Sequence, residues 1–116
     1  MAFFEDLGIW RNAKELSLST YREFQYGYDL GFKDQIQRAS VSIMNNIAEG
    51  SESGTTASYI HFLNIAKGSC AEVRSMLYLA DELNYCSHET AVQAIEQCKC
   101  ITGSINKLIN YLNSRK

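Results

Sequence analysis

The most restrictive feature of this 116-residue sequence is that it contains no proline. Proline breaks helices because its ring clashes with the preceding turn and because it has no amide hydrogen to donate. The breaks that do occur are three stretches rich in glycine and small polar residues, which separate segments of helical periodicity. These stretches are residues 26–31, 49–54 and 84–88. Three breaks predict four helices.

Apolar residues in each segment recur at three- and four-residue steps, as they do on one face of a helix. We expect helices over about residues 7–26, 33–49, 55–83 and 88–113. The core face of the first is expected to hold Trp10, Ala13, Ser17, Tyr21 and Phe24. Gly50 suits the left-handed position after a helix end, Ser53 or Thr55 can cap the third helix, and Ser87 can cap the fourth. The sequence predicts an all-α, antiparallel up-down-up-down four-helix bundle, with residues 1–116 as a single domain.

Composition narrows the class of protein. Hydrophobic residues make up 46% of the chain, and 11 basic and 13 acidic side chains give a net charge of −2. No stretch reaches the ~20 consecutive apolar residues of a membrane-spanning helix. The chain begins with Glu5 and Asp6 where a signal peptide is basic. We expect a cytoplasmic protein that does not bind membranes.

Motifs for chemistry are missing from the sequence. The four cysteines lack the spacing of a zinc site, which favours reduced thiols. The two histidines, His61 and His88, lie on different segments with no nucleophile spacing that identifies a catalytic triad. We therefore predict no catalytic residues, no metal site, no cofactor and no small-molecule substrate, and so no enzyme.

A longer motif occupies residues 35–50, which read Gln-Ile-Gln-Arg-Ala-Ser-Val-Ser-Ile-Met-Asn-Asn-Ile-Ala-Glu-Gly. An aromatic and leucine-containing stretch precedes it at 4–10, and Phe-Leu-Asn-Ile-Ala-Lys-Gly-Ser follows at 62–69. The pattern Q-x-x-R-A-x-x-S-I-x-x-N-I-A-E-G resembles the signature of a four-helix-bundle family, the S23-type proteins encoded in intervening sequences of bacterial 23S rRNA genes. The resemblance extends over nearly the whole chain.

This resemblance implies a four-helix bundle that assembles as a homopentamer and has no established enzymatic activity. It also implies a relationship to the accessory variability proteins of diversity-generating retroelements, which are thought to bind nucleic acid and a reverse transcriptase. The present sequence is mildly acidic, whereas we expect the retroelement proteins to be strongly basic.

Polar residues of the motif form a stripe on the second helix, away from its isoleucines. The stripe contains Gln35, Arg38, Ser42, Asn46 and Glu49. It is either a solvated face or a structural polar network. In the network, Arg38 is expected to reach Glu72 or the Ser69 hydroxyl across an antiparallel hairpin, where a bidentate pair would fix the register.

Additional apolar residues lie beside the core faces of the second and third helices, and they indicate either wide core faces or a subunit interface. The interface candidates are Val41, Met44, Ile60, Ala71 and Tyr78.

Two basic clusters are candidate nucleic-acid contacts, the alternative being ordinary solvated charges. They comprise Arg11, Lys14 and Arg22 on the first helix and Lys67 and Arg74 on the third.

The leading hypothesis is a non-enzymatic homo-oligomer, with a pentamer favoured, that binds RNA or a ribonucleoprotein. The alternative is a structural protein–protein adaptor without nucleic-acid contact.

Overall fold

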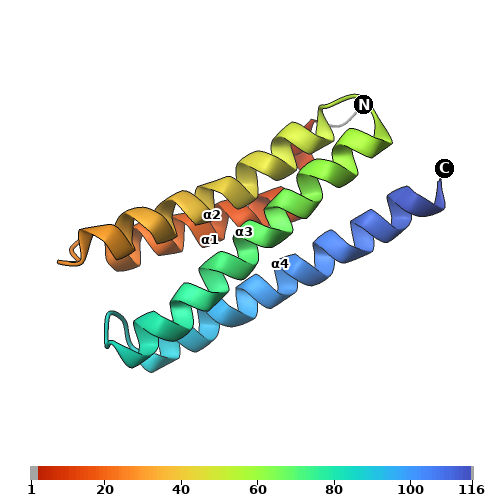
Figure 1. Ribbon diagram of the computed structural model, residues 1–116. Helices are drawn as coiled ribbons and strands as arrows, with labels where there is room; N and C mark the ends of the chain where they lie inside the picture. Colours follow the sequence, from red (N-terminus) through yellow and green to blue (C-terminus); the bar gives the residue numbers. More distant parts are fainter. Residues whose placement is uncertain (1–2, 116) are drawn as a thin grey trace.

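The computed structural model describes residues 3–115, which form helices and connecting loops without a strand. A short 3-10 helix is followed by four α-helices: η1 (Phe4–Asp6), α1 (Gly8–Phe24), α2 (Leu30–Ser51), α3 (Thr56–Glu82) and α4 (His88–Ser114). The α-helices run antiparallel along a common axis, and η1 lies at the same end as the last turn of α4 (Figure 1). The predicted all-α up-down-up-down bundle is confirmed.

Side-chain caps explain where three of the four α-helices begin. Thr55 accepts a hydrogen bond from the Ser58 amide, and Ser87 accepts one from the Thr90 amide. Both caps satisfy amide groups that have no partner within the helix, and both were predicted. The cap of α2 was not predicted: Asp29 accepts from the amide of Phe32, so this helix begins three residues before the expected position.

The core is a single cluster of buried side chains contributed by all four α-helices. On α1 the buried residues are Ala13, Leu16, Ser17, Thr20 and Phe24. Tyr21 was expected in the core but is 44% exposed, and Trp10 is only partly buried. Burying Leu16 removes an entirely apolar side chain from water, whereas a buried Tyr21 would need a partner for its hydroxyl.

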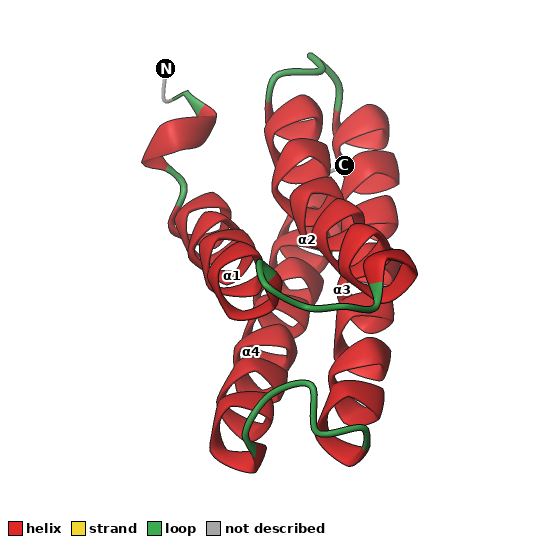
Figure 2. Ribbon diagram, turned by 90° about the vertical axis from the view of Figure 1, so that its left-hand side faces the viewer, coloured by secondary structure: helices red, strands yellow, loops and turns green. Residues whose placement is uncertain are grey.

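Each α-helix contacts its sequence neighbours, and α1 also contacts α4, but the four contacts differ in extent. The α2–α3 pair forms the most extensive contact and the α1–α4 pair the sparsest. The α1–α2 and α3–α4 loops lie together at one end of the bundle, the end nearer the viewer in Figure 2. The α2–α3 loop lies at the other end, near η1.

Gly50 is buried inside α2 and does not follow its end, so its predicted role was wrong. The left-handed backbone occurs instead at Gly54 and at Asn84. A methyl group on Gly50 would lie 2.9 Å from Cβ of Phe62 and 3.1 Å from a ring carbon of Tyr59. Glycine is required here because α2 and α3 approach each other closely.

Replacing Gly50 with alanine should therefore lower the free energy of unfolding by about 1–3 kcal/mol, because the added methyl group overpacks the α2–α3 contact. Gly68→Ala on α3 is the matched control, since Gly68 has open space around its Cα. There the higher helix propensity of alanine should stabilise the protein by about 0.5–1 kcal/mol. Urea unfolding of both variants measures the difference, and stabilisation by Gly50→Ala would contradict the close approach.

Candidate functional site

Hydrogen bonds join α2 to α3 along the outer side of the bundle. We call the side chains that make them, together with Asn46, which binds Ser42 from within α2, the polar ladder: Gln35, Ser42, Asn46, Ser69 and Glu72. The Ser42 and Ser69 hydroxyl oxygens are 2.8 Å apart. Nδ2 of Asn46 donates to the Ser42 backbone oxygen at 2.8 Å and to its hydroxyl oxygen at 3.0 Å. Nearer the α1–α2 loop, Nε2 of Gln35 donates to Oε2 of Glu72 at 3.2 Å. The stripe thus contains interhelical contacts as well as solvated residues.

Arg38 does not take part in these contacts. Its Nε lies 2.9 Å from Oδ2 of Asp34, one turn earlier on the same helix, and both side chains are largely exposed. The predicted contact of Arg38 with Glu72 or Ser69 was wrong, because Gln35 occupies Glu72 and Ser42 occupies Ser69. Glu49 is also exposed.

The five interface candidates lie on two opposite sides of the bundle. Ile60, Ala71 and Tyr78 share the side of α3 on which Lys67 bonds to Asn106 of α4. Gln37 of α2 and Tyr21 of α1 line one shallow hollow, and Val41 and Met44 follow Gln37 by one and two turns on that side of α2, away from Ser42. Ala71 and Tyr78 are exposed, whereas Met44 and Ile60 are partly buried and also pack against the core.

Three of the five candidate nucleic-acid contacts interact with their own chain. Arg11 donates from Nη1 to the backbone oxygen of Glu5 at 3.2 Å. Nζ of Lys14 lies 5.4 Å from the centre of the Trp10 ring, and Nζ of Lys67 donates to Oδ1 of Asn106 at 3.3 Å. Arg22 is exposed on α1, and Arg74 is partly buried on α3. The structure does not gather the five into one patch.

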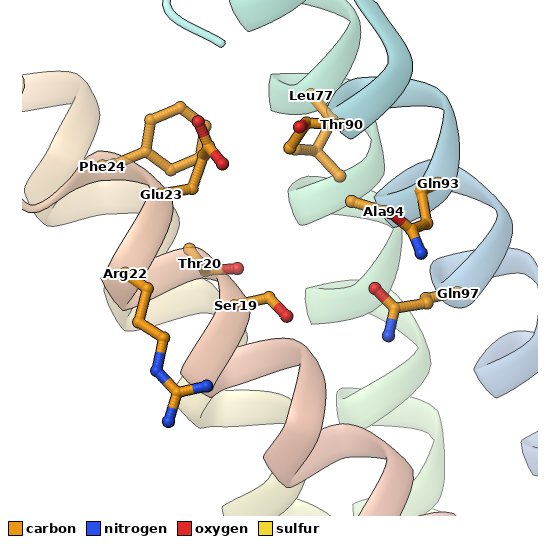
Figure 3. A pocket seen from close by; sticks show the side chains of 10 residues that line it. All are labelled: Ser19, Thr20, Arg22, Glu23, Phe24, Leu77, Thr90, Gln93, Ala94 and Gln97. Atoms are coloured by element: carbon orange, nitrogen blue, oxygen red, sulfur yellow. The ribbon is translucent and has the colours of Figure 1, made fainter. Parts of the chain in front are cut away.

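A groove that the sequence did not predict runs between α1 and α4, where the helices contact each other least. Its volume is about 410 Å³. Ser19 of α1 and Gln97 of α4 point toward one another across it, whereas the Arg22 side chain extends away (Figure 3). Phe24 and Leu77 add apolar surface to these polar walls. Its only sequence signal is the row of glutamines at positions 93 and 97 on α4.

The thiol groups are unpaired. Cys70 donates from Sγ to the backbone oxygen of Cys98 at 3.2 Å, and both residues are fully buried between α3 and α4. The neighbouring Cys98 thiol lowers the pKa of Cys70, and the same contact raises the pKa of Cys98. All four cysteines are free.

Within residues 3–115, no three histidine, cysteine, aspartate or glutamate side chains come together as they would around a metal ion. Every helix in the same range is too short or too polar to cross a lipid bilayer.

The polar ladder makes a direct prediction about stability. Ser69→Ala removes the partner of Ser42 at a partly buried position and should lower the free energy of unfolding by about 1 kcal/mol. Arg38→Met removes only an exposed pair within one helix and should change it by less than about 0.5 kcal/mol. Urea unfolding of the two variants tests this ranking. A larger loss of unfolding free energy for Arg38→Met would show that Arg38, and not the Ser42–Ser69 contact, fixes the register of α2 against α3.

Comparison with solved structures gives a match to a protein of unknown function from the S23 ribosomal protein family of Bacteroides thetaiotaomicron. The TM-score is 0.82 and the sequence identity 22%, over 87% of this chain and 97% of that chain. This likeness shows the shared fold. Curated proteins give no match.

The family model described as 23S rRNA-intervening sequence protein matches residues 5–107, a range that includes every member of the polar ladder. The resemblance seen in the sequence is therefore confirmed, and the chain belongs to the 23S rRNA-intervening sequence protein family.

Proposed function

We propose that this protein is a non-enzymatic, homo-oligomeric binding module, assembled as a pentamer, whose partner is RNA or a ribonucleoprotein. The observation that carries the oligomer is the placement of apolar side chains on two opposite sides of the bundle. One side, the α1/α2 face, contains Tyr21, Val41 and Met44. The other, the α3/α4 face, contains Ile60, Ala71 and Tyr78.

Two different faces support a contact in which the α1/α2 face of one copy packs on the α3/α4 face of the next. Such a heterologous contact closes into a ring when the rotation between copies allows it. Apolar residues at its centre suit the hydrophobic interfaces of stable homo-oligomers. The pentamer itself is supported by the resemblance to a family of homopentamers.

The proposal that the partner is RNA is based on the outward side of α1, where Arg11 and Arg22 are exposed. A ring would repeat this pair once per copy and concentrate positive charge that a single bundle lacks. Phosphate neutralisation by such repeated charges supports binding that is independent of RNA sequence.

A protein–protein adaptor without nucleic-acid contact is the second candidate. It is favoured by the engagement of Arg11, Lys14 and Lys67 with their own chain, which leaves few basic groups free for phosphates. The net charge of −2 also favours the adaptor, because it does not attract a polyanion such as RNA. Both candidates require the oligomer, so they differ only in the partner.

Ala71→Glu tests the oligomer, because it places a charge at the centre of the α3/α4 face without disturbing a buried side chain. We expect the wild-type protein to have a multiple of the 13.1-kDa chain mass by light scattering, and the variant to be monomeric. Tyr111→Glu is the matched control, since Tyr111 is exposed on α4 near its C-terminal end. A monomeric wild-type protein at high concentration would overturn the proposal.

RNA binding is tested with a structured RNA at increasing salt. We expect affinity that falls steeply with salt, and the double variant Arg11→Ala/Arg22→Ala should weaken binding and flatten this dependence. Lys107→Ala, which removes an exposed charge from α4, should change it little. No binding at low salt, together with purified protein free of nucleic acid, would reject RNA and favour the adaptor.

A further inference from the structure

A hollow of about 550 Å³ lies between the α1–α2 and α3–α4 loops, at one end of the bundle, and we call it the loop-end hollow. This is the end away from η1 (Figure 1). The phenolic oxygen of Tyr85 donates to Oδ2 of Asp29 at 2.7 Å and ties the two loops together. The hollow is therefore held by a contact between segments that are far apart in the sequence.

Aromatic rings dominate this hollow. Phe24 and Phe32 pack edge to face with ring centres 5.4 Å apart, and Phe32 and Tyr85 do so at 5.1 Å. Phe24 and Phe32 are buried and anchored in the core. Tyr26 and Tyr28 also line the hollow, and their exposed fractions, 85% for Tyr26 and the whole side chain for Tyr28, leave both rings free to contact a ligand.

The charges around these rings are mainly negative. The hollow is lined by the carboxylates of Glu23 and Asp29. The Phe32 amide and the Tyr85 hydroxyl hold the pKa of Asp29 below its usual value, so Asp29 is ionised at neutral pH. The basic side chain in the lining is Lys33, and its Nζ donates to the backbone oxygen of Gln25 at 2.9 Å.

The thiol of Cys86 lies close enough to Glu23 to be affected by its charge. Burial raises the pKa of Cys86, and the charges of Glu23 and Asp81 raise it further. Exposed aromatic faces beside carboxylates attract cations, because the ring faces are themselves electronegative. Nucleic acid also stacks on aromatic rings, but its sites add basic groups for the phosphates.

We infer that the loop-end hollow is a binding site for an organic cation of the alkylammonium or guanidinium type. Tyr26 and Tyr28 supply ring faces, Glu23 and Asp29 supply the compensating charge, and Phe24, Phe32 and Tyr85 form the floor. The cation is either a free small molecule or a side chain of a basic peptide. The site does not depend on the proposed oligomer or on RNA.

To test this, the isotopically labelled full chain is titrated with choline and with arginine amide at constant ionic strength. Binding is measured by the changes in its amide NMR shifts. We expect saturable shifts confined to the residues around the two loops. The neutral analogue of choline, in which tert-butyl replaces trimethylammonium, should bind about tenfold more weakly. Equal binding of this analogue, or shifts that do not saturate, would overturn the proposal.

Variants locate the site. Tyr26→Ala/Tyr28→Ala and Glu23→Gln should each weaken binding of the cation several-fold, and neither change removes a buried side chain. Tyr111→Ala is the matched control, an exposed tyrosine on α4 outside the hollow, and should leave binding unchanged. Equal weakening by Tyr111→Ala would reject the assignment, and so would tighter binding of adenosine monophosphate than of choline.

An arginine-containing peptide and its citrulline counterpart identify the source of the cation. Tighter binding of the arginine peptide than of arginine amide supports a protein partner. Equal affinity supports a free cation at the same site. Equal binding of the arginine and citrulline peptides would overturn the proposal, because charge would then contribute nothing.

Discussion

The contact between α2 and α3 at Gly50 sets the geometry on which the rest of the bundle depends. With no side chain on Gly50, α2 packs directly against Phe62 and Tyr59. This close approach near the α2–α3 loop brings Ser42 within hydrogen-bond distance of Ser69, two turns further along. The motif therefore combines a glycine that permits close packing with polar side chains that hold the two helices in register. Its sequence pattern records helix packing more directly than it records a binding surface.

Because α2 and α3 are joined so tightly, the bundle is asymmetric. The sparse α1–α4 contact leaves a groove with polar walls, whereas the α2–α3 seam is closed by hydrogen bonds. The five interface candidates, Val41, Met44, Ile60, Ala71 and Tyr78, lie on the two remaining sides. The α1/α2 face and the α3/α4 face differ in sequence. In the proposed oligomer, contact between copies would therefore join unlike surfaces, which favours cyclic assembly over a two-fold dimer.

The sequence was sufficient for helix number, order and most of the core, because periodicity and loop composition report those directly. It was insufficient where two elements meet. Gly50 follows a helical run in sequence, where glycine is typical of a helix end, but α2 continues through it to Ser51 because α3 approaches it closely. Likewise, the spacing of Arg38 placed it opposite α3, but Asp34 on its own helix is nearer. The loop-end hollow depends on Tyr85 reaching Asp29 across 56 residues, and local pattern carries no signal for such a contact.

The shape of the bundle decides which surfaces stay accessible in an oligomer. It extends 46 Å along its axis and 20 by 19 Å across, so side-by-side packing covers the long faces and leaves the ends open. In a closed ring all copies point the same way, which places every loop-end hollow on one rim. A partner with several cationic groups would then engage several hollows at once and gain affinity through effective concentration. Weak binding at a single exposed hollow, as expected for rings that remain largely in water, is compatible with strong binding by the assembly.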